Sequence, residues 1–308
     1  MTTMLSGASI MDGALLVISA HEKCPQPQTR EHLQALDIVG IRNIVVVQNK
    51  IDLVTREEAL ENYKQIKTFL KGSVAEQAPI IPVSAQHGIN LSPLIQAIQE
   101  RIPTPTRETG KPAKMLVARS FDVNRPGTLI EKLVGGVVGG SLVQGTLQVG
   151  SEVELRPGVA VKGKYQPLKT TVKGLHKGGT EVQGAGPGGL VGVSTGLDAY
   201  VTKMDSLAGN ILGTGQLPPV WEKISFKATI LQRVVGSKEE LAVDPIRAGD
   251  VLLITAGIAR TIGTVTLASG GKVEAALKIP ICADKGDKVA LSRQVQGRWR
   301  LIGWGQLL

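Results

Sequence analysis

The stretch Ile44-Val45-Val46-Val47-Gln48-Asn49-Lys50-Ile51-Asp52 decides how the first third of the chain folds. Its uninterrupted β-branched run, followed at once by polar residues, predicts a strand buried on both faces, as in a parallel sheet. Doubly wound sheets bind ligands in loops at the carboxyl ends of their strands. We therefore predict that Asn49, Lys50, Ile51 and Asp52 form one wall of a ligand site.

The sequence on both sides of this stretch alternates between strand and helix patterns. Thr55 and Glu58 form a capping box, and the helix that they open should stop at Gly72 and turn Leu60 towards the core. The alternation predicts a doubly wound α/β domain with a parallel sheet. The other expected elements are strands at Ala14–Ser19 and Ile80–Val83, a helix over Thr29–Leu36 that ends at Gly40, and a helix that begins at Ser92-Pro93 and turns Ile95 inward.

A second loop follows the strand expected at Ile80–Val83 and consists of Ser84, Ala85 and Gln86. The two loops suit guanine, because an Asp carboxylate accepts hydrogen bonds from both the ring N–H and the exocyclic amine of that base. Adenine has no matching pair of donors and would leave the carboxylate unpaired. The small residues of the second loop let backbone N–H groups approach the guanine oxygen. We predict that guanine binds between the two loops.

The remaining two thirds of the chain differ from the first third in sequence pattern. A Pro-rich linker over 102–112 precedes a region, 111–219, that holds 21 of the 37 glycines between short Val, Leu and Thr runs. This pattern is typical of small β-barrels. A second break at Leu217-Pro218-Pro219-Val220 separates it from another all-β region. The predicted architecture is a doubly wound α/β domain over 1–108, a β-barrel over 112–219 and a second β-barrel over 220–308.

Composition narrows the classes of function. The net charge of +9 is uneven, because residues 1–110 carry −1 whereas 111–219 and 220–308 carry +5 each. Such a surface suits a polyanion such as RNA. Cys24 and Cys282 are too few for a zinc site or a disulfide framework, and the four histidines lack paired metal spacing, so we expect no metal ligands in this chain. Apolar runs are too short to cross a bilayer, and a cytoplasmic location without membrane contact is expected.

Several segments resemble the gamma subunit of translation initiation factor two, a family of elongation factor Tu-like translational GTPases. The motifs N-K-I-D-L-V and A-P-I-I-P-V-S-A resemble those near the end of the nucleotide-binding domain in such GTPases. The resemblance extends along essentially the whole chain. The segments that carry it are Met4–Val17, Cys24–Leu33, Arg119–Asn124, Pro187–Val193, Ala290–Arg293 and Trp299–Gly305.

The resemblance implies GTP or GDP with Mg²⁺ as ligands, and initiator methionyl-tRNA, the alpha and beta subunits of a heterotrimer and the small ribosomal subunit as partners. It makes the last barrel part of a tRNA surface, for which we name Arg293, Arg298 and Arg300 as candidates. The Gly-rich stretch Lys177–Gly192 is a further candidate tRNA or partner loop.

The family's phosphate loop, switch residues, zinc knuckle and water-orienting motif have no counterpart in these residues. We therefore expect this chain to be a fragment of such a subunit, with an incomplete doubly wound GTPase domain. It should lack catalytic residues and a Mg²⁺ site. Gly158–Tyr165 has the spacing G-x-x-x-x-G-K, but Tyr165 stands where Ser or Thr must hold Mg²⁺, so we interpret it as a barrel loop.

Three alternatives stay open at this point. The chain could belong to another elongation factor Tu-type GTPase, such as a selenocysteine-specific elongation factor. It could be the GTPase subunit of sulfate adenylyltransferase, which shares the domain order. It could also be a non-catalytic double-barrel module that binds RNA or a protein. Co-purification with methionyl-tRNA would favour the initiation factor.

Overall fold

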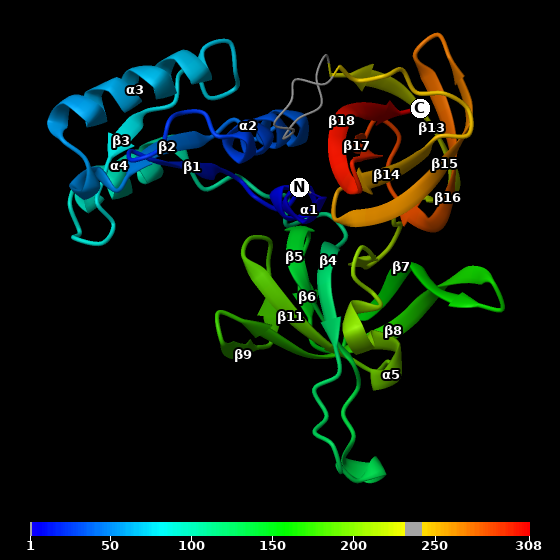
Figure 1. Cartoon of the computed structure of the whole chain (residues 1–308). Coiled ribbons are helices and arrows are strands. Elements are labelled where there is room, and N and C mark those ends of the chain that lie inside the picture. The colour runs from blue at the N-terminus through cyan, green and yellow to red at the C-terminus, as the bar shows by residue number, and fades with distance from the viewer. Residues whose placement is uncertain (1, 232–241) are drawn as a thin grey trace. The chain divides into compact units, whose positions relative to one another are not determined.

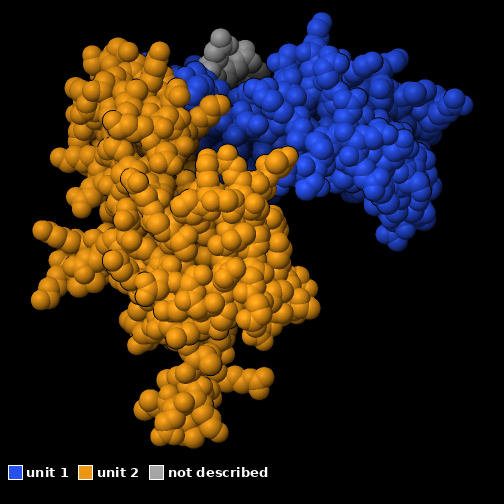
Figure 2. Space-filling view, turned by 180° about the vertical axis from the view of Figure 1, so that it is seen from behind, with its two compact units in different colours: residues 1–105, 229–245, 290–304 blue, residues 106–228, 246–289, 305–308 orange. Residues whose placement is uncertain are grey.

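The computed structural model describes residues 2–231 and 242–308 of the chain (Figure 1). The chain divides into two compact units, which Figure 2 colours separately. One unit contains Met1–Pro105, Thr229–Pro245 and Ala290–Trp304; the other contains Thr106–Ala228, Ile246–Val289 and Gly305–Leu308.

A three-stranded parallel sheet forms the centre of the first 105 residues. Its order is β1 (Ala14–Ser19), β2 (Ile44–Asn49), β3 (Ile80–Pro82), with Ala14 opposite Ile44 and Val46 opposite Ile80. The residues of β2 up to Gln48 are all buried, as the apolar run predicts for a central parallel strand. The expected doubly wound pattern is confirmed for this part of the fold.

Four α-helices accompany the sheet: α1 (Thr2–Ala8), α2 (Pro27–Val39), α3 (Arg56–Leu70) and α4 (Leu91–Arg101). One apolar cluster joins Leu16, Ile18, Ile44 and Val46 of the strands to Leu33 and Leu36 of α2 and to Ile66 and Leu70 of α3. Val45 and Val47 alternate with these side chains and are buried too, and α4 contacts β2. Both faces of the central strand are therefore covered.

Local signals place the helix ends, with two differences from the sequence expectation. The capping box of Thr55 and Glu58 is present, and Gly40 ends α2 in the left-handed region at φ 88°. Helix α2 begins at Pro27 rather than Thr29, because proline at the first helical position needs no N–H partner. Helix α4 begins at Leu91, directly after Asn90, which has φ 59°.

Two predictions about helix faces were wrong. Leu60 is 54% exposed and Ile95 is 56% exposed. Asn62 occupies the buried face of α3 where the pattern predicted apolar contact, and Ala97 is the buried residue of α4. Asn62 is accommodated because its side chain hydrogen-bonds with buried partners, described below.

The middle region forms a β-barrel, as predicted. Strand β11 pairs with β5 on one edge and with β8 on the other, so the order β11-β5-β4-β12-β7-β8 closes into a ring. Its strands are β4 (Lys114–Phe121), β5 (Val137–Gln144), β6 (Leu147–Gln148), β7 (Glu152–Val161), β8 (Lys164–Lys177), β9 (Thr180–Val182), β10 (Gly184–Ala185), β11 (Leu190–Thr195) and β12 (Ile211–Gly213). Short helical turns are η2 (Ile130–Lys132), α5 (Ala199–Thr202) and η3 (Lys203–Asp205).

The interior of this barrel is aliphatic. Met115, Val138, Leu142, Leu155 and Leu175 are each fully buried in one cluster. Glycine is required where β5 crosses β4, because a Cβ on Gly140 would lie 1.8 Å from the Leu116 carbonyl oxygen. Close strand packing is thus one reason for glycine in this region, and others, such as Gly163 at φ 82°, lie in turns with a left-handed backbone.

The last region forms a second closed barrel of order β13-β16-β15-β14-β17-β18. Phe226, Leu252, Ile254 and Leu291 are fully buried in its strands. The strands are β13 (Val220–Ile230), β14 (Val251–Ala256), β15 (Ala259–Ser269), β16 (Lys272–Cys282), β17 (Lys288–Val295) and β18 (Arg298–Leu307).

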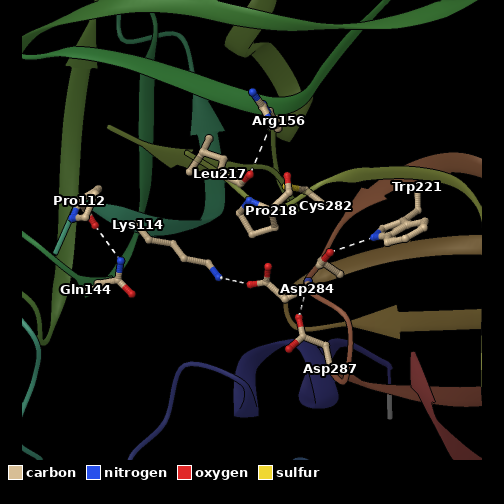
Figure 3. A network of polar contacts seen from close by, with 11 residues as sticks. Pro112, Lys114, Gln144, Arg156, Leu217, Pro218, Trp221, Cys282, Asp284 and Asp287 are labelled. Atoms are coloured by element: carbon tan, nitrogen blue, oxygen red, sulfur yellow. Dashed lines mark hydrogen bonds and ion pairs between the residues drawn. The ribbon is translucent and has the colours of Figure 1, made fainter. Parts of the chain in front are cut away.

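A polar network fixes the linker between the two barrels (Figure 3). Arg156 on β7 donates to the Leu217 carbonyl at 3.5 Å, and the Cys282 thiol donates to the Pro218 carbonyl at 3.1 Å. Nearby, Lys114 on β4 pairs with Asp284 at 3.2 Å (Figure 3). Burial raises the pKa of the Cys282 thiol to about 12, so the thiol keeps its proton and acts as a donor.

Candidate guanine-binding site

The two predicted loops lie at the same edge of the parallel sheet. Ser19 is opposite Asn49 and Gln48 is opposite Pro82, so β1, β2 and β3 end side by side. After β2 the chain turns through Lys50, at φ 63°, into the short helix η1 (Ile51–Leu53). After β3 it enters the turn that begins at Ser84. The strand order thus brings together residues that are far apart in sequence.

The side chain of Asn49 ties the two loops to each other. Its Oδ1 accepts hydrogen bonds from the Lys50 backbone N–H at 2.8 Å and from the Ala85 backbone N–H at 3.1 Å. The backbone adds a further link, since the Ile51 N–H donates to the Val83 carbonyl at 3.3 Å. Asn49 therefore has a positioning role in this structure, holding the second loop beside the first.

Asp52 faces the second loop. The Ser84 hydroxyl donates to its carboxylate, and this hydrogen bond is the main reason that the Asp52 pKa lies below its ordinary value of 3.8. Ser84 itself is fully buried and the side chain of Asp52 is 19% exposed, whereas Lys50, Ala85 and Gln86 are open to solvent. A base can therefore approach the carboxylate from solvent while the serine supports it from below.

A buried polar chain supports this edge of the sheet from beneath. Gln48 donates to Asn62 Oδ1 at 3.0 Å and to the Ala59 carbonyl at 2.8 Å. Asn62 in turn donates to the Glu22 carbonyl at 2.8 Å, in the loop after β1. These bonds connect β2, α3 and the β1 loop. Sequence reasoning missed Asn62, because a polar residue on a helix gives no signal of burial.

A cavity of about 220 Å³ opens beside the first loop. It is lined by residues at the ends of β1 and β2 and by the start of α2. Its lining includes the polar residues Ser19, Lys23, Asn49 and Lys50. This position beside the loop after β2 suits the ribose of a nucleotide whose base lies between the two predicted loops.

His87 is a contact that the sequence did not reveal. Its Nε2 lies 3.7 Å from Asp52 Oδ2, and its backbone N–H donates to Ser84 Oγ at 3.4 Å. The only available signal was its position three residues after Ser84, in a loop already singled out. The structure thus adds the His87 imidazole to the side chains that the sequence predicts for the guanine site.

The three arginines named for tRNA have different surroundings. Arg300 on β18 forms an ion pair with Glu31 of α2, at 2.7 Å between Nη1 and Oε1. Arg293 on β17 donates to the Asp244 and Pro245 carbonyls at 3.0 and 3.2 Å. Arg298 follows the turn at Gln296 and Gly297 and is exposed. Of the three, only Arg298 is exposed, whereas Arg293 and Arg300 are partly buried.

The remaining candidate sites are resolved by local geometry. Gly158–Tyr165 lies at the end of β7 and the start of β8, so no helix follows its glycines and it is a hairpin, as interpreted. Over residues 2–231 and 242–308, no group of three His, Cys, Asp or Glu side chains has metal-binding geometry. In the same part of the chain no helix is both long and apolar enough to cross a membrane.

Replacing Ser84 by Ala is expected to raise the Asp52 pKa towards its ordinary value. The depressed pKa means that the interaction stabilises the fold above pH 3.8 and is lost as the pH falls through the lowered pKa. Without the hydroxyl the folded-state pKa approaches the unfolded-state pKa, so this pH-dependent contribution to stability should shrink. Carbon-13 NMR titration of the Asp52 carboxyl measures the change directly. An unchanged Asp52 pKa in the variant would show that Ser84 does not support the carboxylate.

The fold and the site define a GTP-binding domain of the elongation factor Tu type followed by two β-barrels. Residues 1–104 match the elongation factor Tu GTP-binding domain, and 135–212 match elongation factor Tu domain 2. Residues 222–307 match the family described as initiation factor eIF2 gamma, C terminal.

Curated relatives identify the family. The translation initiation factor 2 gamma subunit of Pyrococcus horikoshii is 58% identical over 99% of this chain and 75% of its own length. The corresponding subunits of Thermococcus kodakarensis and Methanocaldococcus jannaschii are 59% and 55% identical over similar shares. The chain belongs to the family of translation initiation factor 2 gamma subunits, GTPases of translation initiation, and spans about three quarters of the length of these relatives.

Solved structures of other translation factors share the fold. Elongation factor SelB from Methanococcus maripaludis, in complex with the GTP analogue GppNHp, superposes with a TM-score of 0.77 at 24% identity, over 99% of this chain and 67% of that one. A bacterial selenocysteine-specific elongation factor gives 0.78 at 21% identity and is covered over 46% of its length. At this identity the likeness concerns the fold alone.

Proposed function

We propose that this chain recognises the guanine of GTP or GDP and takes part in delivering initiator methionyl-tRNA to the small ribosomal subunit, within a heterotrimer with alpha and beta subunits. One observation carries the guanine assignment: Asp52 and the turn from Ser84 to Gln86 are held against each other, through Ser84 and through the 3.1 Å bond from Ala85 to Asn49. Such delivery takes place in the cytoplasm. The proposed domains are 1–108, 112–219 and 220–308.

The proposed roles in base recognition follow from chemistry. The Asp52 carboxylate accepts from the guanine ring N–H and amine, and the Lys50 stem lies on the base. The Ala85 and Gln86 backbone approaches the guanine oxygen. A nucleotide bound with Mg²⁺ would supply the group that is hydrolysed, and the residues described here bind the base without contributing a catalytic group.

A polypeptide of these 308 residues, tested alone, is expected to bind GTP weakly and not to hydrolyse it. Phosphoryl transfer depends on Lys, Mg²⁺ and backbone N–H groups around the phosphates, and the one G-x-x-x-x-G-K match is the β7–β8 hairpin. Titration with a fluorescent GTP analogue, with and without Mg²⁺, measures the affinity. Tight Mg²⁺-dependent binding would contradict this part of the proposal.

Arg298 is expected to contribute to tRNA affinity through a phosphate contact. It is exposed, whereas substituting Arg300 would also break the pair with Glu31 and substituting Arg293 would release the Asp244 and Pro245 carbonyls. In filter binding of initiator methionyl-tRNA, Arg298→Ala should lower the slope of log affinity against log salt by about 0.7 per lost phosphate contact. Lys67→Ala on α3 is the matched control. An Arg298→Ala slope equal to that of the control removes Arg298 from the tRNA surface.

A further inference from the structure

The turn after β3 holds its backbone in one conformation. The Ser84 N–H donates to the Ile89 carbonyl at 3.3 Å, and the Ile89 N–H donates to the Ser84 carbonyl at 3.0 Å. Gly88 supplies the left-handed conformation at φ 68° that closes the turn. Asn90 fastens the turn to β3 through a 2.8 Å bond to the Pro82 carbonyl. A closed turn of this kind places the side chain of His87 at a fixed point.

That fixed point lies beside the carboxylate of Asp52. His87 Nε2 is 3.7 Å from Asp52 Oδ2, and the Asp52 side chain is only 19% exposed although His87 is 60% exposed. Two groups of the same turn therefore flank the carboxylate, the hydroxyl of Ser84 and the imidazole of His87. Lys50 is a further neighbour of the carboxylate, and its ammonium favours the ionised form of Asp52.

We propose that His87 is a positioning residue that sets the orientation of Asp52 and thereby the discrimination between guanine and hypoxanthine. The proposal rests on guanine binding at Asp52. Guanine presents two parallel donors, the ring N–H and the amine, so both carboxylate oxygens must lie in the plane of the base. Hypoxanthine lacks the amine and needs only one oxygen. A carboxylate that swings out of plane therefore loses more with guanine than with hypoxanthine.

If His87 instead competed with guanine, removing it would have the opposite effect on guanine affinity. If the imidazole competed with the base for Oδ2, its removal would strengthen guanine binding. The place of His87 on the same turn as Ser84, whose Oγ accepts from the His87 backbone N–H, favours support over competition. His87 acts through Asp52 in this account and has no contact with the base of its own.

The ratio of the GMP and IMP affinities of the 308-residue chain tests the proposal, measured by ligand-titration NMR. Both ligands carry the same phosphate and ribose, so their affinity ratio reports the base edge alone. In His87→Ala the preference for GMP should fall by about two- to fivefold, the size expected for losing a polar contact that is open to solvent on one side. His87→Gln should restore part of it, because an amide N–H can still face the carboxylate. His176→Ala, an exposed histidine on β8, is the matched control.

Each outcome separates this inference from the proposed function. If Asp52→Ala abolishes the GMP preference while His87→Ala leaves it unchanged or raises it, the positioning role is overturned and guanine recognition stands. An equal loss of GMP and IMP affinity in His87→Ala also overturns the positioning role, because it indicates a general disturbance of the loop. If Asp52→Ala leaves the preference intact, guanine recognition by this site fails and the inference fails with it.

Discussion

Replacing Asp52 by Asn is expected to change the base preference of the site from guanine to xanthine. The carboxylate accepts both donors of guanine, whereas an amide accepts from the ring N–H and donates to the carbonyl that xanthine carries in place of the amine. Asp52 lies in contact with Ser84 at the open edge of the sheet, so the substitution changes the hydrogen-bonding pattern without filling space. GMP affinity should fall by roughly tenfold to a hundredfold, the range for losing a paired base-edge contact.

Competition between GMP and XMP for the chain, followed by ligand-observed NMR, measures this exchange of preference. Asp37→Asn on α2 makes the same chemical change at an exposed position and should leave both affinities unaltered. A chain with Asp52→Asn that still prefers GMP would place the base elsewhere.

Replacing Glu31 by Ala is expected to loosen the packing of α2 against β18. The Glu31 carboxylate is 9% exposed and its partner Arg300 is 22% exposed, so the substitution leaves a largely buried guanidinium without its partner. The cost should be about 3 kcal/mol, at the lower end for buried pairs because Arg300 retains some solvent contact. An apolar cluster of Leu5, Ala35, Ile38, Ala290 and Leu301 adjoins the pair.

Amide hydrogen exchange in α2 measures this loosening, because local opening exposes the Ala35 and Ile38 amides. Exchange there should accelerate by about a hundredfold, the rate equivalent of that energy. The double variant Glu31→Leu with Arg300→Met removes both charges and should recover most of the protection, since an apolar pair has no desolvation cost. Protection in Glu31→Ala close to that of the unmodified chain would show that the ion pair contributes little.

Local patterns in the sequence were sufficient for the sheet and for placing the loops after β2 and β3 side by side, whereas guanine binding there stays a prediction. The β-branched run before Asn49 predicts a central parallel strand, and the order of strands then brings Ser84 beside Asp52. The capping box at Thr55 predicts where α3 begins. These features depend on neighbours in sequence or on one simple topological rule.

The errors concern contacts that no local pattern encodes. Leu60 is exposed because the polar chain through Asn62 occupies the inner face of α3. Arg300 and Glu31 are separated by 269 positions in sequence, so nothing near either residue indicates the pair. Arg293 and Arg300, two of the three candidate tRNA arginines, have partners within the chain that the sequence did not indicate, and the tRNA role of all three stays a prediction. The contact between His87 and Asp52 depends on how the turn after β3 closes, which no local pattern indicates.

The most direct test of the account is a titration of the chain with GDP and with ADP, followed by the amide resonances of Lys50 and Ala85. Both N–H groups are held by Asn49 Oδ1 at the edge of the predicted base site. The account predicts that GDP shifts both resonances and that ADP shifts neither. Equal shifts with the two nucleotides, or no shift with GDP, would contradict it.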